Sequence, residues 1–416
     1  MTTKQSLLPL SDPSRPYFTH RFSLLAVYAL ALSVNLGVAL VSISKLLVLI
    51  AICVKVLSLI AQKRWQVTRS GCWTFSAIGL ALAWMSLSWF WSEALPAERW
   101  QSLGRQARLW VLPAVFYLLE TKQDALKAMY LLILGQMFVV MSSWLLWLGV
   151  PLPWAMSTYP NEFGIVFTSS LEQPVMGTFM LVLIWFLRHE IPQPWRNRVV
   201  AASVVLTTLN VFFVMSGRTG YLVMLLAISL AVFWQLPRLV SKKWRLLAVI
   251  SPLLIAISLA LVSTKFQTRM LEIKRDVLAY SQEGRFNSSQ GQRLDYWIAS
   301  IKATADKPLL GSGVGSWRGS YFQHGGVDNI NFTTNPHQQY LLWSVESGLI
   351  GLLLLLAIFV AAYRDSKLLE GHTQQALRAT LAITFLMGLM NCPFFGAGMG
   401  EFIFLMTAAL LATKQR

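Results

Sequence analysis

Long apolar segments separated by short polar ones make up most of this chain of 416 residues. Hydrophobic residues account for 55% of the sequence and charged residues for only 13%, a balance typical of membrane proteins rather than soluble globules. A backbone that crosses a bilayer must satisfy its own hydrogen bonds, and apolar segments of this kind do so as helices. We therefore expect an all-α polytopic membrane protein.

The apolar segments predict about twelve transmembrane helices, several of them shorter than the roughly 20 residues of a full crossing. The predicted organisation is a bundle of nine spans in residues 1–263, a large polar loop in 264–339, and three further spans in 340–416. The spans are placed at 22–36, 43–61, 71–91, 107–119, 125–148, 174–187, 199–216, 220–236, 246–263, 340–363, 379–392 and 400–413.

Basic residues outnumber acidic ones by 35 to 18, which could indicate a nucleic-acid binder. In a membrane protein this excess is better explained by cytoplasmic loops, which are rich in Lys and Arg, so we expect no nucleic acid as partner. With the N-terminus inside, every short inside loop carries Lys or Arg, whereas the outside segment 150–173 carries none. Both termini are thus predicted to be cytoplasmic and the large loop periplasmic.

Arg218 lies in the short sequence Ser216–Tyr221 between two apolar runs. A charge at this depth is costly unless it faces a polar cavity or an anionic partner, and Gly217 and Gly220 would allow a sharp turn and close approach of a ligand. The alternative is a snorkelling arginine in a tight helical hairpin.

Two further arginines on the outer side are candidate site residues. Arg293 is four residues from Trp297 and borders an apolar stripe with helical spacing, so it should point toward the protein. A salt bridge with Asp295 or Asp306 is the alternative. Arg105 precedes the fourth predicted span, where an interfacial anchor is favoured.

His337 lies where the polar loop meets the next apolar segment. Asn335 is a good N-cap and Pro336 suits the first helical position, so His337 is predicted in the first helical turn. The positive end of the helix dipole would keep the ring neutral and able to accept a proton, and the same helix end attracts phosphate. His324 is a weaker rival.

Other parts of the loop favour scaffolding over chemistry. Residues 266–277 carry apolar positions at steps of four, three and four, which predicts an amphipathic helix on the membrane surface. Gly311–Gly315 lacks the Lys-Ser/Thr of a P-loop, and a plain turn is favoured over an anion-binding nest. No DxD or HExxH motif occurs, and Cys53, Cys72 and Cys392 all fall in apolar runs, so neither a disulfide framework nor a metal site is expected.

The pattern His337-Gln338, nine residues, then Gly348-Leu349-Ile350-Gly351 resembles the signature of bacterial O-antigen ligases. The Arg218 turn, the number of spans and the single large outer loop before the histidine also resemble that family. The resemblance extends over essentially the whole chain. O-antigen polymerases and protein O-oligosaccharyltransferases share the same plan.

The resemblance implies a helical membrane glycosyltransferase of the C type, in the bacterial inner membrane, with its active site at the periplasmic face. It implies transfer of O-antigen polysaccharide from undecaprenyl pyrophosphate to lipid A-core during lipopolysaccharide assembly. His337 would be catalytic, and Arg218 and Arg293 would bind pyrophosphate. Arg105 and Gln338 are secondary candidates, chosen for charge and position.

The residues suit a reaction that needs neither metal nor cofactor. Arginines can neutralise the departing diphosphate, a neutral imidazole can serve as general base, and direct attack would invert the anomeric carbon. A lipid-linked sugar flippase or transporter remains an alternative of a different class. Transporters carry polar residues through their whole depth and often internal repeats, whereas the mid-span positions here are strongly apolar.

Overall fold

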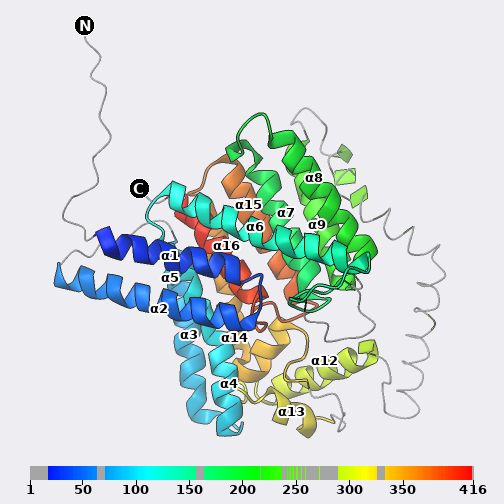
Figure 1. The fold of residues 1–416 in the computed structure, drawn as a ribbon. Helices are drawn as coiled ribbons and strands as arrows, with labels where there is room; N and C mark the ends of the chain where they lie inside the picture. Colours follow the sequence, from blue (N-terminus) through cyan, green and yellow to red (C-terminus); the bar gives the residue numbers. More distant parts are fainter. Residues whose placement is uncertain are drawn as a thin grey trace.

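The computed structural model describes residues 17–62, 71–155, 164–215, 217–236, 289–325 and 333–414, with isolated positions between 241 and 271. Over these residues the fold is helical, without strands (Figure 1). In chain order the helices are α1 (Tyr17–Ser33), α2 (Val38–Ala61), α3 (Cys72–Leu87), α4 (Pro96–Gln106), α5 (Val111–Leu118), α6 (Lys122–Trp147), α7 (Glu172–Phe186), α8 (Arg196–Leu209), α9 (Arg218–Gln235), α12 (Ser289–Asp306), α13 (Trp317–Gln323), α14 (Gln339–Ser366), α15 (Gly371–Gly388) and α16 (Met399–Ala412).

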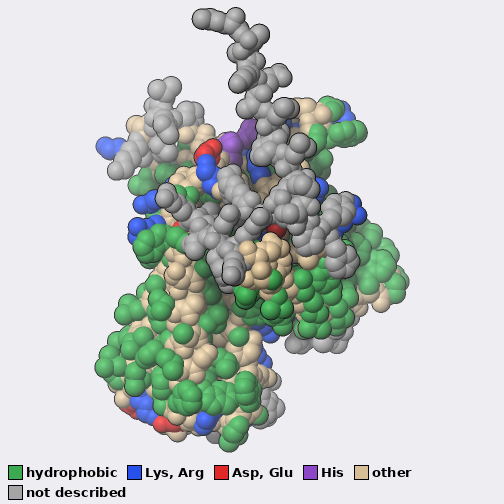
Figure 2. Space-filling model, turned by 90° about the vertical axis from the view of Figure 1, so that its left-hand side faces the viewer, with side chains coloured by type: hydrophobic (Ala, Val, Ile, Leu, Met, Phe, Trp, Pro, Cys, Tyr) green, Lys and Arg blue, Asp and Glu red, His purple; other side chains and the backbone are tan. Residues whose placement is uncertain are grey.

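Five helical segments of the described chain are long and apolar enough to cross a membrane, namely α2, α6, α14, α3 with the turn that follows it, and α8 with its π-helical continuation. Only 17% of the apolar window of α2 is buried inside the protein, so most of its side chains are left for the bilayer. Figure 2 shows apolar side chains spread broadly over one face of the molecule. The protein is therefore a multi-pass membrane protein.

The centre of the fold is formed by α16 and α7. All 14 residues of α16 are buried, and α7 is buried along most of its length, with the rings of Phe179 and Phe402 in contact at 6.3 Å between centroids. At 1.5 Å per residue α16 is only about 21 Å long, less than the roughly 30 Å of a hydrocarbon core. Irregular chain next to such a helix is stable because protein surrounds it and satisfies its backbone groups. The segment 389–398, between α15 and α16, is of this kind.

The long helix α14 is kinked at Gly348, whose φ of 65° and ψ of −167° are not helical. Leu349 N–H donates to Pro308 O at 2.7 Å, and Val345 O accepts from Ser312 N–H at 2.8 Å. The two groups that would pair with each other in a straight helix are thus satisfied by the chain that follows α12. A Cβ on Gly348 would lie 2.1 Å from Leu309 O, so this close approach requires glycine.

The end of the molecule where α14 begins also carries α4, α12 and α13, and we call it the His337 end (Figure 1). Ser102 on α4 donates to the buried carboxylate of Glu346 at 2.8 Å, which fastens α4 to the first part of α14. The rings of Tyr296, Trp317 and Tyr321 pack together and join α12 to α13.

Most predicted spans coincide with helices, namely α1–α3, α5–α9 and α14–α16, with ends that differ by several residues. The largest difference is α15, which begins at Gly371 rather than at residue 379 because its polar first turns are helical as well. The predicted span 246–263 and the predicted amphipathic helix 266–277 lie almost entirely outside the described residues.

Candidate active site

The chain turns sharply at His337, immediately before α14. With a φ of 51°, His337 is the one non-glycine residue with positive φ in the described part of the chain. Its N–H donates to Asn335 Oδ1 at 2.9 Å, so the asparagine side chain stabilises the turn two residues on. The prediction that Asn335 caps the helix and His337 lies in its first turn is therefore wrong, since a positive φ cannot continue a right-handed helix.

The helix instead begins at Gln339, with Gln338 as its N-cap. Gln338 Oε1 accepts a hydrogen bond from Leu341 N–H at 2.6 Å, a role usually filled by a shorter polar side chain. This contact gives Gln338 a structural role and places His337 one residue before the cap, with its ring free of the helix.

Helix α12 lies against the His337 turn. Trp297 Nε1–H donates to Pro336 O at 3.0 Å, and the ring of Tyr296 lies 6.4 Å from that of His337 between centroids. Arg293 is one turn earlier on the same helix and is close enough for its charge to act on His337. The sequence-based expectation that Arg293 points toward the protein agrees with this arrangement.

The segment between α15 and α16 holds the turn from the other side. Asn391 Oδ1 lies 3.4 Å from His337 Nδ1, and Asn391 O accepts from Gln339 N–H at 3.1 Å. Gln339 Oε1 in turn accepts from Phe394 N–H at 3.2 Å. The imidazole is therefore fixed by residues of α12 on one side and by a C-terminal loop on the other.

The environment of His337 favours the neutral ring. Burial is the largest cause that lowers the pKa of His337 below its ordinary 6.5, and the positive charge of Arg293 lowers it further, while the contact with Asn391 opposes both. Among the described residues, none hydrogen-bonds to Nε2. Nε2 can therefore accept a proton at neutral pH, provided that Nδ1 carries the ring hydrogen.

Arg105 reaches the same turn from α4. Its Nη1 donates to Thr334 Oγ1 at 2.9 Å, and its guanidinium carbon lies 4.2 Å from the centroid of the Phe395 ring. Burial and the neighbouring Arg108 lower the pKa of Arg105, whereas Glu346 opposes this, and an arginine so placed still remains a cation at neutral pH. The structure thus brings Arg105 into the His337 turn rather than leaving it as a remote interfacial anchor.

Arg218 is the first residue of α9, and its side chain is outside the description. Its neighbouring glycines allow close packing of the chain at this turn, and the approach of a ligand to them stays a prediction. A Cβ on Gly217 would lie 2.1 Å from Ser170 O, and one on Gly220 would lie 2.6 Å from Pro174.

His324, the weaker candidate for the catalytic histidine, has a structural role. Its Nδ1 contacts Ser320 O and its Nε2 contacts Asp306 Oδ2, each at 2.7 Å, and the bond to Asp306 raises the pKa of His324. Asp295 Oδ2 accepts from Tyr321 OH at 2.6 Å, so both carboxylates once considered as partners of Arg293 have partners of their own.

The glycines of Gly311–Gly315 are packed against backbone on three sides and do not form an open nest. Cβ atoms at Gly311, Gly313 and Gly315 would lie 2.2–2.7 Å from the backbones of α14, of Ser92 and of α4. Their neighbour Val314 donates its N–H to Ser88 Oγ at 3.1 Å. Gly311–Gly315 therefore forms a plain turn, as favoured from the sequence, rather than an anion-binding nest.

A second buried polar group lies beneath the 389–398 segment. Glu401, which is fully buried, accepts from Lys45 Nζ at 2.7 Å, lies 3.5 Å from Arg108 Nε and caps its own helix through Gly398 N–H. Arg108 also donates to Phe395 O at 2.9 Å. These contacts anchor the segment that carries Asn391.

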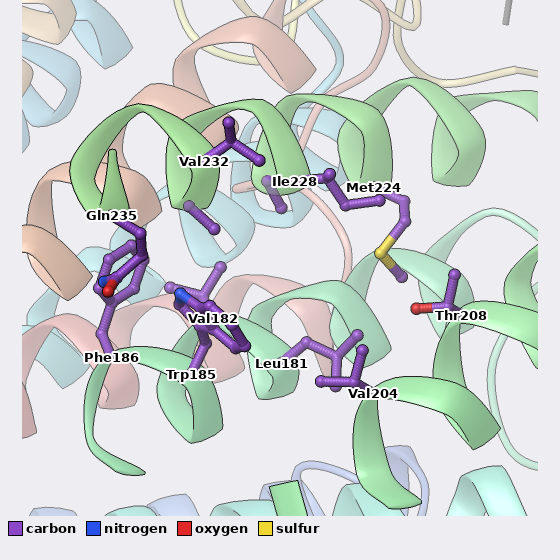
Figure 3. A pocket seen from close by; sticks show the side chains of 12 residues that line it. Leu181, Val182, Trp185, Phe186, Val204, Thr208, Met224, Ile228, Val232 and Gln235 are labelled. Atoms are coloured by element: carbon purple, nitrogen blue, oxygen red, sulfur yellow. The ribbon is translucent and has the colours of Figure 1, made fainter. Parts of the chain in front are cut away.

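A cavity of about 260 Å³ lies away from these groups, between α7, α8 and α9 (Figure 3). Its walls are apolar apart from Thr208 and Gln235, and none of its lining residues is titratable, so it offers no acid or base. Among the described residues, no three of His, Cys, Asp and Glu are close enough to hold a metal ion.

Asn391, Tyr296 and Phe395 were not predicted from the sequence. Asn391 lies 54 residues from His337 and only ends an apolar run, so nothing local connects the two. Tyr296 was not identified because an aromatic residue at helical spacing is normally assigned to the hydrophobic core.

Comparison with known proteins gives one similar protein and one matching family model. A protein of Haemophilus influenzae, described only as uncharacterized, is 23% identical over 194 residues, which cover 44% of this chain and 47% of that protein. The chain thus matches about half the length of that relative. Residues 202–356, a segment that contains Arg218, Arg293 and His337, match the family model of the O-antigen ligases, and this confirms the resemblance seen in the sequence.

Proposed function

We propose that this protein is an inverting, metal-independent glycosyltransferase that moves O-antigen polysaccharide from undecaprenyl pyrophosphate to lipid A-core. The reaction would take place at the periplasmic face of the inner membrane. The observation that carries the proposal is the placement of the His337 imidazole, whose Nδ1 faces Asn391 Oδ1, whose Nε2 has no hydrogen-bond partner among the described residues, and beside which Arg293 lies. The family match supports the class of lipid-linked substrate.

The chemical step is a single displacement. The acceptor hydroxyl oxygen attacks the anomeric carbon of the donor sugar, and the bond from that carbon to the diphosphate oxygen breaks. The hydroxyl proton passes to His337 Nε2, and undecaprenyl pyrophosphate leaves with the bonding electron pair. A general base of this kind contributes about 10²–10⁴-fold to the rate.

The arginines supply the electrostatic part. A guanidinium about 4 Å from a phosphate oxygen gains up to about 4 kcal/mol at an effective dielectric of 20, before desolvation. Arg293 adjoins His337 and Arg105 contacts the same turn, so both are suited to the departing diphosphate. Arg218 is proposed for the same role from its place at the start of α9. Their forked donors match phosphate geometry.

The test is transfer by purified protein in detergent or liposomes, with lipid-linked polysaccharide, lipid A-core and no ion gradient. His337→Ala should lose at least about a hundredfold in kcat while keeping its thermal stability. Turnover near wild type would remove the histidine from catalysis, and a requirement for a gradient would favour a transporter.

Acceptor choice separates the ligase from its relatives. The same donor is offered with lipid A-core, with a second lipid-linked oligosaccharide, or with a hydroxyl-bearing protein. Product on lipid A-core alone supports the ligase. Elongated lipid-linked product would identify a polymerase, and glycosylated protein an O-oligosaccharyltransferase.

A further inference from the structure

Asn391 contacts the His337 turn at two points. Its side-chain oxygen faces His337 Nδ1 at 3.4 Å, and its backbone oxygen accepts from Gln339 N–H at 3.1 Å. Its own N–H is fixed at the end of α15 by Met387 O at 2.8 Å, and the side chain is buried. The backbone of Asn391 is therefore fixed at the end of α15, and its buried side-chain oxygen faces the ring.

An amide oxygen is only an acceptor, so the hydrogen between the two groups must come from the imidazole. We propose that Asn391 is the positioning residue of the proposed glycosyl transfer, because it selects the His337 tautomer with hydrogen on Nδ1 and the lone pair on Nε2. This inference rests on the proposed function. It gives the C-terminal segment 389–398 a part in the reaction, although the segment does not touch the reacting atoms.

The tautomer matters because Nδ1 faces Asn391, whereas Nε2 has no hydrogen-bond partner among the described residues. If the hydrogen moved to Nε2, that atom could no longer take a proton from the acceptor, and the remaining lone pair would point at Asn391 Oδ1. Removing a partner that orients a metal-bound imidazole typically costs about 10–100-fold in metal affinity or activity, and we expect a loss of similar size here. In other enzymes, too, a hydrogen bond from Nδ1–H to an oxygen fixes the tautomer of a histidine that acts as a base through Nε2.

The charged and titratable groups around His337 come from each element that surrounds it. Arg293 and Tyr296 face it from α12, and Arg105 contacts its turn from α4. Cys392 follows Asn391, and its thiol is buried. No carboxylate of the described residues shifts the pKa of His337, so Asn391→Asp would place a negative charge next to the ring where the wild type has none.

Two substitutions separate positioning from packing. Asn391→Leu keeps the branched shape and the number of side-chain heavy atoms and removes the acceptor, so kcat should fall about 10–100-fold with little change in KM. Asn391→Asp keeps the acceptor and adds a charge that favours imidazolium, so the pKa of His337 should rise. Because the base is lost as pH falls through its pKa, the acid limb of the kcat profile should move to higher pH, with activity retained above it.

Thr74→Val is the matched control. It removes a buried hydrogen bond, Thr74 Oγ1–H to Asp365 Oδ2 at 2.7 Å, near the far end of α14. That site lies on the second part of α14, beyond the kink at Gly348 and away from the His337 turn. Any loss of stability should leave the shape of the pH profile and the KM unchanged.

The tautomer itself is read by NMR of protein with ¹⁵N-labelled histidine, in which His337→Gln identifies the signal among the five histidines. Wild type and Asn391→Asp should show hydrogen on Nδ1, and Asn391→Leu a mixture. Wild-type tautomer and kcat in Asn391→Leu, or an unmoved acid limb in Asn391→Asp, would overturn the inference. A shifted tautomer combined with full turnover of His337→Ala would support the contact and overturn the proposed function.

Discussion

The backbone of His337 occupies the left-handed region, which costs a non-glycine residue about 1–3 kcal/mol when the surroundings impose it. Here the surroundings are identifiable, namely the Asn335 side chain, Asn391 and Trp297. Strain of this kind is often kept at functional sites, and here it accompanies the contact of the ring with Asn391.

Backbone strain at His337 predicts an order of stability among inactive variants. His337→Gly removes the strain, whereas His337→Ala retains it, so the glycine variant should be the more stable by about 1 kcal/mol. Thermal unfolding of the two purified proteins in the same detergent measures this difference. Equal midpoints would mean that the turn relaxes without the imidazole.

The charge of Arg293 predicts a second effect at the residue scale. Arg293 lowers the pKa of His337, so Arg293→Gln should raise it and move the acid limb of the kcat profile to higher pH. The plateau rate should also fall, because the leaving diphosphate loses a cation. Arg318→Gln, on α13 and paired with Glu98 at 3.5 Å, is the control and should leave the limb in place. If the acid limb of the kcat profile does not move in Arg293→Gln, the charge of Arg293 does not influence the pKa of His337.

The local sequence around individual residues was enough to propose some members of the candidate site. His337 and Arg293 were found because each stands out locally, one at a loop exit and one beside an apolar stripe. The placement of His337 on a helix failed because Asn335-Pro336 is also compatible with a turn, and the asparagine oxygen bonds the His337 N–H instead of capping α14. Asn391 could not be found, because its role exists only once α15 is folded against α14.

At the element scale, the kink in α14 is the feature that shapes the His337 end. Gly348 lets the first part of the helix turn away from the second, and the chain after α12 enters the gap and takes over the freed backbone groups. The sequence showed Gly348 and Gly351 only as part of a signature. The physical reason for Gly348 is its contact with Leu309 and Gly311, which no periodicity could reveal.

The kink predicts that Gly348→Ala destabilises the protein by about 2 kcal/mol or more, since the residue has positive φ and its Cβ would meet Leu309 O. Gly79→Ala is the control, because it lies inside α3 with nothing within 4 Å of the added methyl, and it should be neutral or stabilising by up to about 1 kcal/mol. Midpoints of thermal unfolding compare the two. A neutral Gly348→Ala would mean that the α12–α14 connection is pliable.

At the scale of the whole molecule, ion pairs occur at both ends of the bundle. Lys55 pairs with Glu120 at 3.0 Å and Lys122 with Glu190 at 2.7 Å opposite His337, and Arg318 pairs with Glu98 at 3.5 Å near it. The His337 end also holds Arg105 over the ring of Phe395 and the imidazole of His337 between α12 and the 389–398 segment. Cations near an imidazole suit an anionic substrate, and the asymmetric excess of basic residues in the short loops of the opposite end suits a cytoplasmic face.

This asymmetry predicts an orientation that single cysteines can measure in cells. In a background where Cys53, Cys72 and Cys392 are replaced by alanine, Gly319→Cys on the exposed surface of α13 should react with a membrane-impermeant maleimide added from the periplasmic side. Lys414→Cys, just after α16, should react only after the inner membrane is opened, because the excess of basic residues keeps that end inside. If only Lys414→Cys were labelled in intact membranes, the bundle would have the opposite orientation to the one predicted. His337 would then face the cytoplasm, where a periplasmic polysaccharide donor could not reach it, and the proposed transfer would be excluded by topology whatever the chemistry of the ring.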